Sequence, residues 1–245
     1  MTPGEDSGFW FLNQMYAAVK PYLVSVIRYC EGEVENGAMG VLMDLGGPIL
    51  ATNFHVVERV THDSRYTLHP VLKGPSTGLQ LFSAHRGLDL ATLRSAEMTP
   101  EMIERYGEGG LLDLPSGGIT ADQIRQPEIG KPIYAAGFPN CTRDIIDDGT
   151  GPKQSFKIVS VVYSIIDYSD GVITLDRSKA TGNADPNFLG MSGSPLWQIE
   201  PFESGFHLHL VGLLKGTPDP DGPYVVGNSF RDLEATGRWK YERIA

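Results

Sequence analysis

Two serines stand between glycine and proline residues in the segment FLGMSGSPLW, which covers positions 188–197. A serine hydroxyl is a poor nucleophile at neutral pH unless a neighbouring base takes its proton. A nucleophilic role for Ser192 or Ser194 therefore requires a histidine as the base and a further group that orients the histidine ring. The chemistry that such a set would support is nucleophilic attack through a covalent intermediate.

Candidates for both partners lie earlier in the chain. The segment ILATNFHVV places His55 directly after a run that reads as a buried strand. The segment GLDLATLR places Asp89 between apolar residues, where a carboxylate needs a strong partner to offset the loss of hydration. Either residue alone has an ordinary structural explanation, the histidine as a core side chain and the aspartate as a turn cap. The hypothesis of a catalytic set depends on their combination.

The order of these residues separates two classes of serine hydrolase. In α/β-hydrolases the order is serine, acid, histidine, and the serine lies on a Gly-x-Ser-x-Gly turn between a strand and a helix. Here the order is His55, Asp89, Ser192. Ser194 stands where that turn requires glycine, and Pro195 disfavours a helix that starts there. The α/β-hydrolase interpretation therefore fails.

The elements that must position these residues are mostly strands. Runs rich in valine, isoleucine, leucine and tyrosine are separated by turn-forming residues: YLVSVIRYC, AMGVLMDL, PIYAAGF, SFKIVSVVYSII, GVITLD and HLHLVGLLKG. Helical patterns are few: FWFLNQMYAAVK at 9–20, TPEMIERY at 99–106 and SFRDLEATGRWKYERI at 229–244. The pattern predicts an all-β barrel or sandwich, with a connection between two halves at residues 107–129.

Charge and composition narrow the class of partner. The 245 residues include 20 lysines and arginines against 30 aspartates and glutamates, which gives a formal net charge of −10. This balance argues against nucleic acid and against an anionic membrane as partners. The N-terminus has acids where a secretory signal has bases, and the chain has no apolar run of about 18 residues. We therefore expect a soluble protein of the cytoplasm.

Metal and redox sites have little support in the sequence. Cys30 and Cys141 lie far apart and form no spacing that is typical of a metal or redox site. His207 and His209 would share one face of a strand, as a zinc pair requires, but no third ligand is apparent nearby. The sequence predicts no metal ion and no cofactor.

Three segments together resemble the motifs of the trypsin-like, chymotrypsin-fold serine proteases. TNFHVV is similar to their Thr-Ala-Ala-His segment, DLATL to Asp-Ile-Ala-Leu, and GMSGSP to Gly-Asp-Ser-Gly-Gly-Pro. The resemblance covers about residues 23–232 and includes a glycine-rich hairpin like that of bacterial members. It implies two six-stranded antiparallel β-barrels with the active site between them. The implied organisation is an N-terminal helical extension at 1–21, barrels at 22–106 and 130–232, and a C-terminal helix at 233–245.

The resemblance also implies a role for each site residue. Ser192 would be the nucleophile, His55 the general base and then acid, and Asp89 the buried acceptor that fixes the tautomer of the histidine. The main-chain N–H groups of Gly190 and Ser192 would form the oxyanion hole. Ser194 would be a small structural neighbour, because it stands where the family has a second glycine.

One departure from the family concerns activation. Met191 stands where digestive members have an aspartate that pairs with a newly cleaved N-terminal amine. The chain therefore resembles bacterial members that are not activated by N-terminal cleavage. Such an enzyme is either competent as synthesised or has its oxyanion loop, residues 180–191, ordered by another event.

Substrate preference is left open by the residues of the expected pocket. Pro186 occupies the position of the pocket base, and Asp185 beside it would favour a basic side chain. Lys215 and Gly216 lie on the expected opposite wall, where the lysine would favour an acidic side chain. Neither preference is predicted over the other.

The resemblance implies a serine endopeptidase that acts on protein or peptide substrates through an acyl-enzyme. The alternatives are an esterase with the same chemistry, a catalytically silent binding or scaffold protein of the same fold, and a latent protease that a partner activates. The N-terminal helix is expected to pack on a barrel through one apolar face, and its alternative role is a docking surface for a regulatory protein partner. That face would comprise Phe9, Trp10, Leu12, Met15 and Tyr16.

Overall fold

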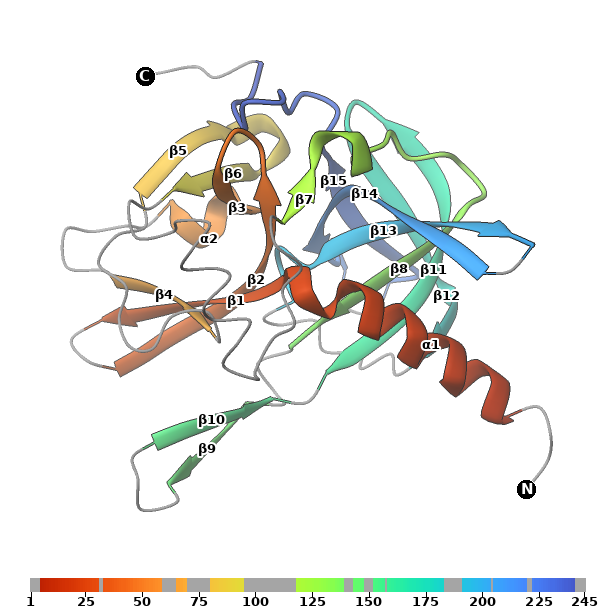
Figure 1. The fold of residues 1–245 in the computed structure, drawn as a ribbon, viewed down its shortest axis with the longest axis horizontal. Coiled ribbons are helices and arrows are strands. Elements are labelled where there is room, and N and C mark those ends of the chain that lie inside the picture. Colours follow the sequence, from red (N-terminus) through yellow and green to blue (C-terminus); the bar gives the residue numbers. More distant parts are fainter. Residues whose placement is uncertain are drawn as a thin grey trace.

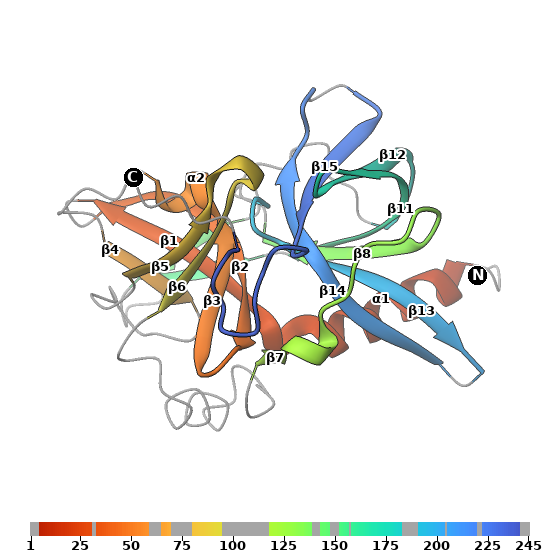
Figure 2. The same cartoon turned by 90° about the horizontal axis from the view of Figure 1, so that it is seen from above.

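A computed structural model shows two β-sheet halves that lie side by side, with one long helix across the second half (Figures 1 and 2). The structure describes residues 5–30, 33–58, 65–69, 80–94, 118–138, 143–147, 152–156, 158–182, 191–203, 205–219 and 222–240. Within these ranges the expected all-β architecture is confirmed, because almost all regular structure is antiparallel sheet.

The N-terminal half is a six-stranded antiparallel path with one added strand. Its order is β4 (Arg65–His69), β1 (Leu23–Cys30), β2 (Glu33–Asp44), β3 (Pro48–Asn53), β6 (Leu90–Arg94) and β5 (Gln80–His85). The short strand β7 (Ile119–Thr120) pairs in parallel with β2. Within the described residues the two end strands, β4 and β5, do not pair with each other, so this sheet is not a closed ring.

The C-terminal half is a closed barrel of six strands. Its order is β11 (Val159–Ser169), β12 (Val172–Gly182), β15 (Tyr224–Ser229), β14 (Gly205–Gly216), β13 (Pro195–Phe202) and β8 (Pro132–Gly137). Alternate residues of β11 point inward, so Val161, Tyr163 and Ile165 fill the barrel. A separate hairpin of β9 (Arg143–Asp147) and β10 (Pro152–Phe156) projects from the two sheets (Figure 1).

A second apolar cluster joins the two halves. It begins in the N-terminal sheet with Met39, Val41 and Ile49 and continues to Trp197 and Leu213 of the barrel, all of which are buried. Because these side chains are buried against one another, the core holds the two halves in a fixed relative placement, and the junction between them is not flexible. The site residues that come from different halves are therefore held in one packed body.

The N-terminal helix packs on the C-terminal barrel, as expected. The helix α1 (Glu5–Val19) buries Met15 and Val19 completely or nearly so, and Phe11 meets Phe206 of β14 edge to face at 5.5 Å. Trp10 does not belong to the apolar face, because its side chain is 63% exposed. Of the other predicted members, Leu12 and Tyr16 pack against the core, and the Phe9 side chain lies outside the described residues.

The predicted C-terminal helix at 233–245 is wrong over its described part. Residues 233–240 form turns and an isolated bridge between Leu233 and Trp239. Gly237 adopts φ +77, which ends any helix, and Trp239 stacks on Phe230 with ring centroids 6.0 Å apart. The two aromatic rings pack across a turn in place of the helix that the sequence pattern suggested.

The connection predicted at 107–129 is partly ordered structure. From residue 118 onward it contains β7 and the 3₁₀ turn η3 (Ala121–Gln123), and Ile124 then bridges Leu210 of β14. This segment therefore contacts both sheets. The predicted helix at 99–106 and the first part of the connection, 107–117, lie outside the described residues. No helix in the described part of the chain is both long and apolar enough to cross a membrane.

Candidate active site

His55 lies on a single helical turn, α2 (Phe54–Val57), directly after β3. Two groups next to His55 donate hydrogen bonds to the main-chain oxygen of Asp89 and so fix the start of this turn. The N–H of Phe54 donates to that oxygen at 2.9 Å, and the side-chain amide of Asn53 donates to it at 3.1 Å. Asn53 is not among the residues predicted from the sequence, although a polar residue at the end of an apolar strand is a signal for a local hydrogen-bonding role.

Asp89 presents both carboxylate oxygens to His55. Oδ1 accepts the main-chain N–H of His55 at 2.8 Å, and Oδ2 lies 2.7 Å from Nδ1 of the ring. The Asp89 side chain is 13% exposed, whereas the imidazole is 46% exposed. The short contact places the Nδ1 proton toward the carboxylate, so the other ring nitrogen, Nε2, is available as a base.

The turn that contains Ser192 is fixed by main-chain hydrogen bonds from both halves. The oxygen of Ser192 accepts the N–H of Met39 of β2 at 2.7 Å, and the N–H of Gly193 donates to Leu214 of β14 at 2.9 Å. Gly193 has φ +84, and a β-carbon there would collide with the main-chain oxygen of Met39. Only glycine satisfies both conditions, which explains why the serine is followed by glycine.

Ser194 is a structural residue. Its side chain is completely buried, its hydroxyl lies 3.8 Å from the sulfur of Met191, and its main-chain oxygen accepts from Leu214. Ser192, by contrast, is only half-buried. Of the two serines, only Ser192 can meet a molecule that approaches from solvent.

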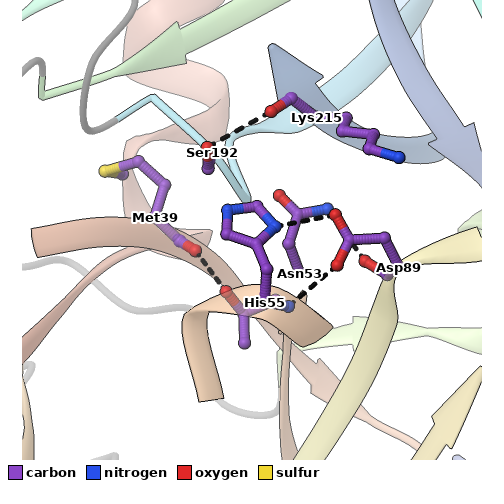
Figure 3. Close-up of polar contacts among 7 residues, drawn as sticks. Met39, Asn53, His55, Asp89, Ser192 and Lys215 are labelled. Carbon is purple, nitrogen blue, oxygen red and sulfur yellow. Dashed lines mark hydrogen bonds and ion pairs between the residues drawn. The ribbon is translucent and has the colours of Figure 1, made fainter. Parts of the chain in front are cut away.

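The Ser192 hydroxyl lies near the His55–Asp89 pair but is not bonded to it. Figure 3 shows the second ring nitrogen of His55 turned toward Ser192, while the hydroxyl itself donates to the main-chain oxygen of Lys215 at 3.2 Å. Within the described residues no hydrogen bond joins Ser192 to His55.

The predicted oxyanion hole and substrate pocket are only partly described. Gly190, Asp185 and Pro186 lie outside the described residues. Lys215 is exposed, and Figure 3 shows its side chain running away from Ser192. Gly216 is half-buried at the end of β14. The structure thus brings the main chain of Lys215, rather than its ammonium group, to the serine.

Met191 is buried against the barrel core, with 1% of its surface exposed. Its sulfur and methyl group lie beside Gly137, where a β-carbon would contact them. An apolar side chain fits this environment, whereas a carboxylate here would lose its hydration without a cationic partner. This packing agrees with the inference that no salt bridge to a new N-terminus forms at this position.

His207 and His209 each have a partner among the described residues. Nε2 of His209 lies 3.0 Å from Glu200, and the ring of His207 stacks on Phe202 with centroids 4.4 Å apart. Among the residues that the structure describes, no group of three histidine, cysteine, aspartate or glutamate side chains could hold a metal ion. Cys141 and the side chain of Cys30 lie outside those residues.

Comparison with known proteins places the fold. The sequence matches no protein-family model and no curated protein, but many solved structures are similar to it. The serine endoprotease from Yersinia pestis superposes with a TM-score of 0.52 at 17% identity, over 89% of this chain and 62% of that one. The Rv3671c protease from M. tuberculosis, in its active form, gives 0.53 at 16%, over 90% and 81%. The fold is chymotrypsin-like.

A viral protease is similar at a lower score. The tobacco etch virus protease, complexed with product, has a TM-score of 0.49 at 15% identity, over 87% of this chain and 75% of that one. This chain spans about three fifths of the length of the Yersinia protease. At these identities the similarity establishes the shared fold, and the chemistry of the site must be argued from its own residues.

Proposed function

We propose that this chain is a serine peptidase in which Ser192, His55 and Asp89 form the catalytic triad. The observation that carries the proposal is the double contact between Asp89 and His55, at 2.7 and 2.8 Å, which turns the second ring nitrogen toward Ser192. A carboxylate in this position orients the imidazole and stabilises it when it becomes charged. The chymotrypsin-like fold supports peptides as the substrate class.

The proposed reaction begins with a rotation of the Ser192 side chain away from Lys215. Nε2 of His55 then takes the hydroxyl proton while Oγ attacks the carbonyl carbon of the scissile peptide bond. The developing oxyanion is received by main-chain N–H groups, for which the family resemblance implies Ser192 and Gly190. His55 returns the proton to the leaving amine, and an acyl-enzyme remains on Ser192.

The second half of the cycle uses the same groups. His55 takes a proton from a water molecule, the resulting hydroxide attacks the ester carbonyl, and the proton returns to Oγ of Ser192 as the acid product leaves. Asp89 keeps its negative charge throughout and holds the imidazolium that forms in each half. The proposal needs no metal ion or cofactor.

A latent protease is the second candidate, and one observation favours it. The hydroxyl of Ser192 is bonded to the oxygen of Lys215 and not to the base. A protein partner or the substrate itself could supply the change that releases this hydroxyl. The N-terminal helix, with Trp10 exposed on its surface, is the proposed contact for such a partner.

A peptide-library digest followed by mass spectrometry tests the proposal. The parent chain is expected to cleave amide bonds, and Ser192→Ala and His55→Ala are expected to lose turnover by about three orders of magnitude or more. Ser194→Ala is the matched control and should retain activity, because this serine is buried away from solvent. Cleavage products that persist in both Ser192→Ala and His55→Ala would contradict the proposal.

The same digest, run beside an assay with ester substrates, separates the alternatives. Turnover of ester but not amide substrates would indicate an esterase, and an inert parent would favour the latent or silent forms of the fold. The residues on the N-terminal side of the cleaved bonds then show which side chain the substrate pocket prefers. Selection of arginine or lysine would support Asp185, and selection of aspartate or glutamate would support Lys215.

A further inference from the structure

A second histidine–carboxylate pair lies beside the first, outside the residues assigned to the triad. His85 ends β5, and its Nε2 lies 3.6 Å from Oδ2 of Asp232, which follows β15. The same carboxylate oxygen accepts from Nε of Arg231 at 3.1 Å. The side chains of His85 and Asp232 are both largely buried, with 15% and 11% of their surfaces exposed. Burial of such polar groups costs free energy, and pairing with each other offsets this cost.

His85 caps the turn that carries Asp89. Its Nδ1 accepts the main-chain N–H of Leu88 at 3.1 Å, so it is the N-cap of the 3₁₀ turn η2 (Arg86–Leu88). Asp89 is the C-cap of the same turn and adopts a left-handed conformation, φ 51 and ψ 44. A non-glycine residue holds this conformation only where its surroundings impose it.

The two contacts of His85 specify one tautomer. An Nδ1 atom that accepts an N–H carries no proton, so the ring proton lies on Nε2, on the side of Asp232. Asp232 thus faces the ring proton of His85 at 3.6 Å, a longer distance than the 2.7 Å between Asp89 and the ring of His55. The His85–Asp232 pair lies at the start of the turn η2, and the His55–Asp89 pair lies at its end, four residues further along the chain.

The partner carboxylate comes from the other half of the molecule. After β15 the chain returns along the N-terminal sheet (Figure 2), where the main-chain oxygen of Gly237 accepts from Thr92 at 2.8 Å. The N–H of Trp239 donates to the hydroxyl of Ser83 at 3.0 Å, and its ring meets the His85 ring edge to face. The returning segment therefore contacts both β5 and β6, the strands before and after the turn η2.

We propose that His85 and Asp232 are positioning residues that keep Asp89 in the conformation required to orient His55. This inference rests on the proposed role of Asp89 in the triad. The path is short and direct: Asp232 orients His85, His85 caps the turn at Leu88, and the turn sets the backbone of Asp89. Through this path, formation of the His55–Asp89 pair depends on docking of the C-terminal segment that carries Asp232.

The test compares His85→Ala with His85→Asn. Alanine removes the contacts to Leu88 and Asp232, whereas the asparagine oxygen lies near the position of Nδ1 and is a good N-cap. Two readouts are used on protein that is shown to be folded at the assay temperature. One is the second-order rate of Ser192 modification by a fluorophosphonate, and the other is the low-field proton resonance of the His55 Nδ1–H···Asp89 hydrogen bond.

His85→Ala is expected to slow modification by about tenfold or more and to lose the low-field resonance, because a small displacement of Asp89 misorients the base. His85→Asn should recover most of both signals. Asp232→Ala keeps the cap and should give a partial loss, and it serves as the test if His85→Ala fails to fold. A purely structural role would lower the melting temperature and leave both readouts unchanged, and this result would overturn the inference.

The resonance also separates this inference from the proposed function. If the parent is not modified by the fluorophosphonate but shows a resonance that His85→Ala loses, the positioning role stands and the peptidase proposal fails. If the parent is modified and the variants match it in both rate and resonance, the peptidase proposal stands and the positioning role fails.

Discussion

The charge and the geometry of Asp89 can be separated by one substitution. Asparagine has the same shape and tolerates the left-handed conformation that Asp89 adopts, φ 51. Asp89→Asn should therefore keep the turn, yet the amide has no negative charge to stabilise the imidazolium. When its oxygen accepts the main-chain N–H of His55, its NH2 group donates to Nδ1 and leaves the ring proton on Nε2, which can then no longer act as the base. The expected loss in the rate of Ser192 modification is about three to four orders of magnitude.

The measurement for Asp89→Asn is the fluorophosphonate rate constant, with circular dichroism and thermal melting as the check on folding. A melting curve close to that of the parent is expected. A rate within about tenfold of the parent would show that Asp89 contributes only through shape, and the triad assignment would then fail.

Tyr163 gives a residue-scale prediction about stability. Its ring is buried inside the C-terminal barrel, and within the described part of the chain its hydroxyl has no hydrogen-bond partner. Tyr163→Phe removes this unpaired polar group and keeps the ring. The free energy of unfolding at pH 7 is expected to rise by about 1 kcal/mol. Urea denaturation measures the change, and a loss of more than 1 kcal/mol would mean that the hydroxyl has a partner after all.

The same tyrosine predicts a dependence of stability on alkaline pH. Burial raises the pKa of Tyr163, and also that of Tyr134, whose hydroxyl bonds to Ser160 at 2.9 Å. Below the ordinary tyrosine pKa of about 10, both phenols are neutral in the folded and the unfolded chain, so stability is complete. Above it the unfolded chain releases protons that the folded chain retains, and stability falls as pH rises.

Tyr163→Phe should therefore lose less stability between pH 9 and pH 11 than the parent, because one of the two buried phenols is gone. Denaturation midpoints at several pH values give the comparison. Parallel curves for the two proteins would show that Tyr163 does not contribute to the alkaline loss.

At the scale of the element, the turn before β13 depends on a close approach of two backbones. Gly193 and Gly130 share the same φ, +84, but a β-carbon at Gly193 would collide with the oxygen of Met39 whereas nothing lies within 4 Å at Gly130. Gly130→Ala should cost about 1 kcal/mol for backbone strain alone. Gly193→Ala should cost about 3 kcal/mol or more, because the turn must also move away from β2.

Thermal or urea denaturation of the two alanine variants isolates the close approach. Equal losses of stability would mean that β2 yields without cost and that the Ser192 turn is not fixed by Met39. A larger loss at Gly193, accompanied by slower modification of Ser192, is the result that the packing predicts.

The elements differ in how far the sequence could predict them. Strands such as 159–169 alternate buried and exposed residues, and this pattern is visible in the sequence. The helical pattern at 233–240 was misleading, because the stacking of Trp239 on Phe230 is a contact across a turn that no periodicity encodes. The exposure of Trp10 likewise depends on the angle at which α1 crosses the barrel.

At the scale of the whole molecule, the site is assembled from both halves. His55 and Asp89 belong to the N-terminal half, Ser192 lies in the turn before β13 of the barrel, and the main-chain hydrogen bond from Met39 to Ser192 joins the two halves at 2.7 Å. The motifs pointed to Ser192, His55 and Asp89 because residue types and their order indicate the chemistry, and the roles of these residues stay a prediction. The motifs could not predict the hydroxyl bond to Lys215 or the support from His85, because both depend on contacts between distant segments.

The most direct measurement is intact-mass analysis after treatment with a fluorophosphonate, which modifies a serine only when a base activates it. The parent and Ser194→Ala are each predicted to gain one phosphonyl group, and Ser192→Ala to gain none. An adduct that persists in Ser192→Ala, or a folded parent that gains no adduct, would contradict an assembled triad of Ser192, His55 and Asp89.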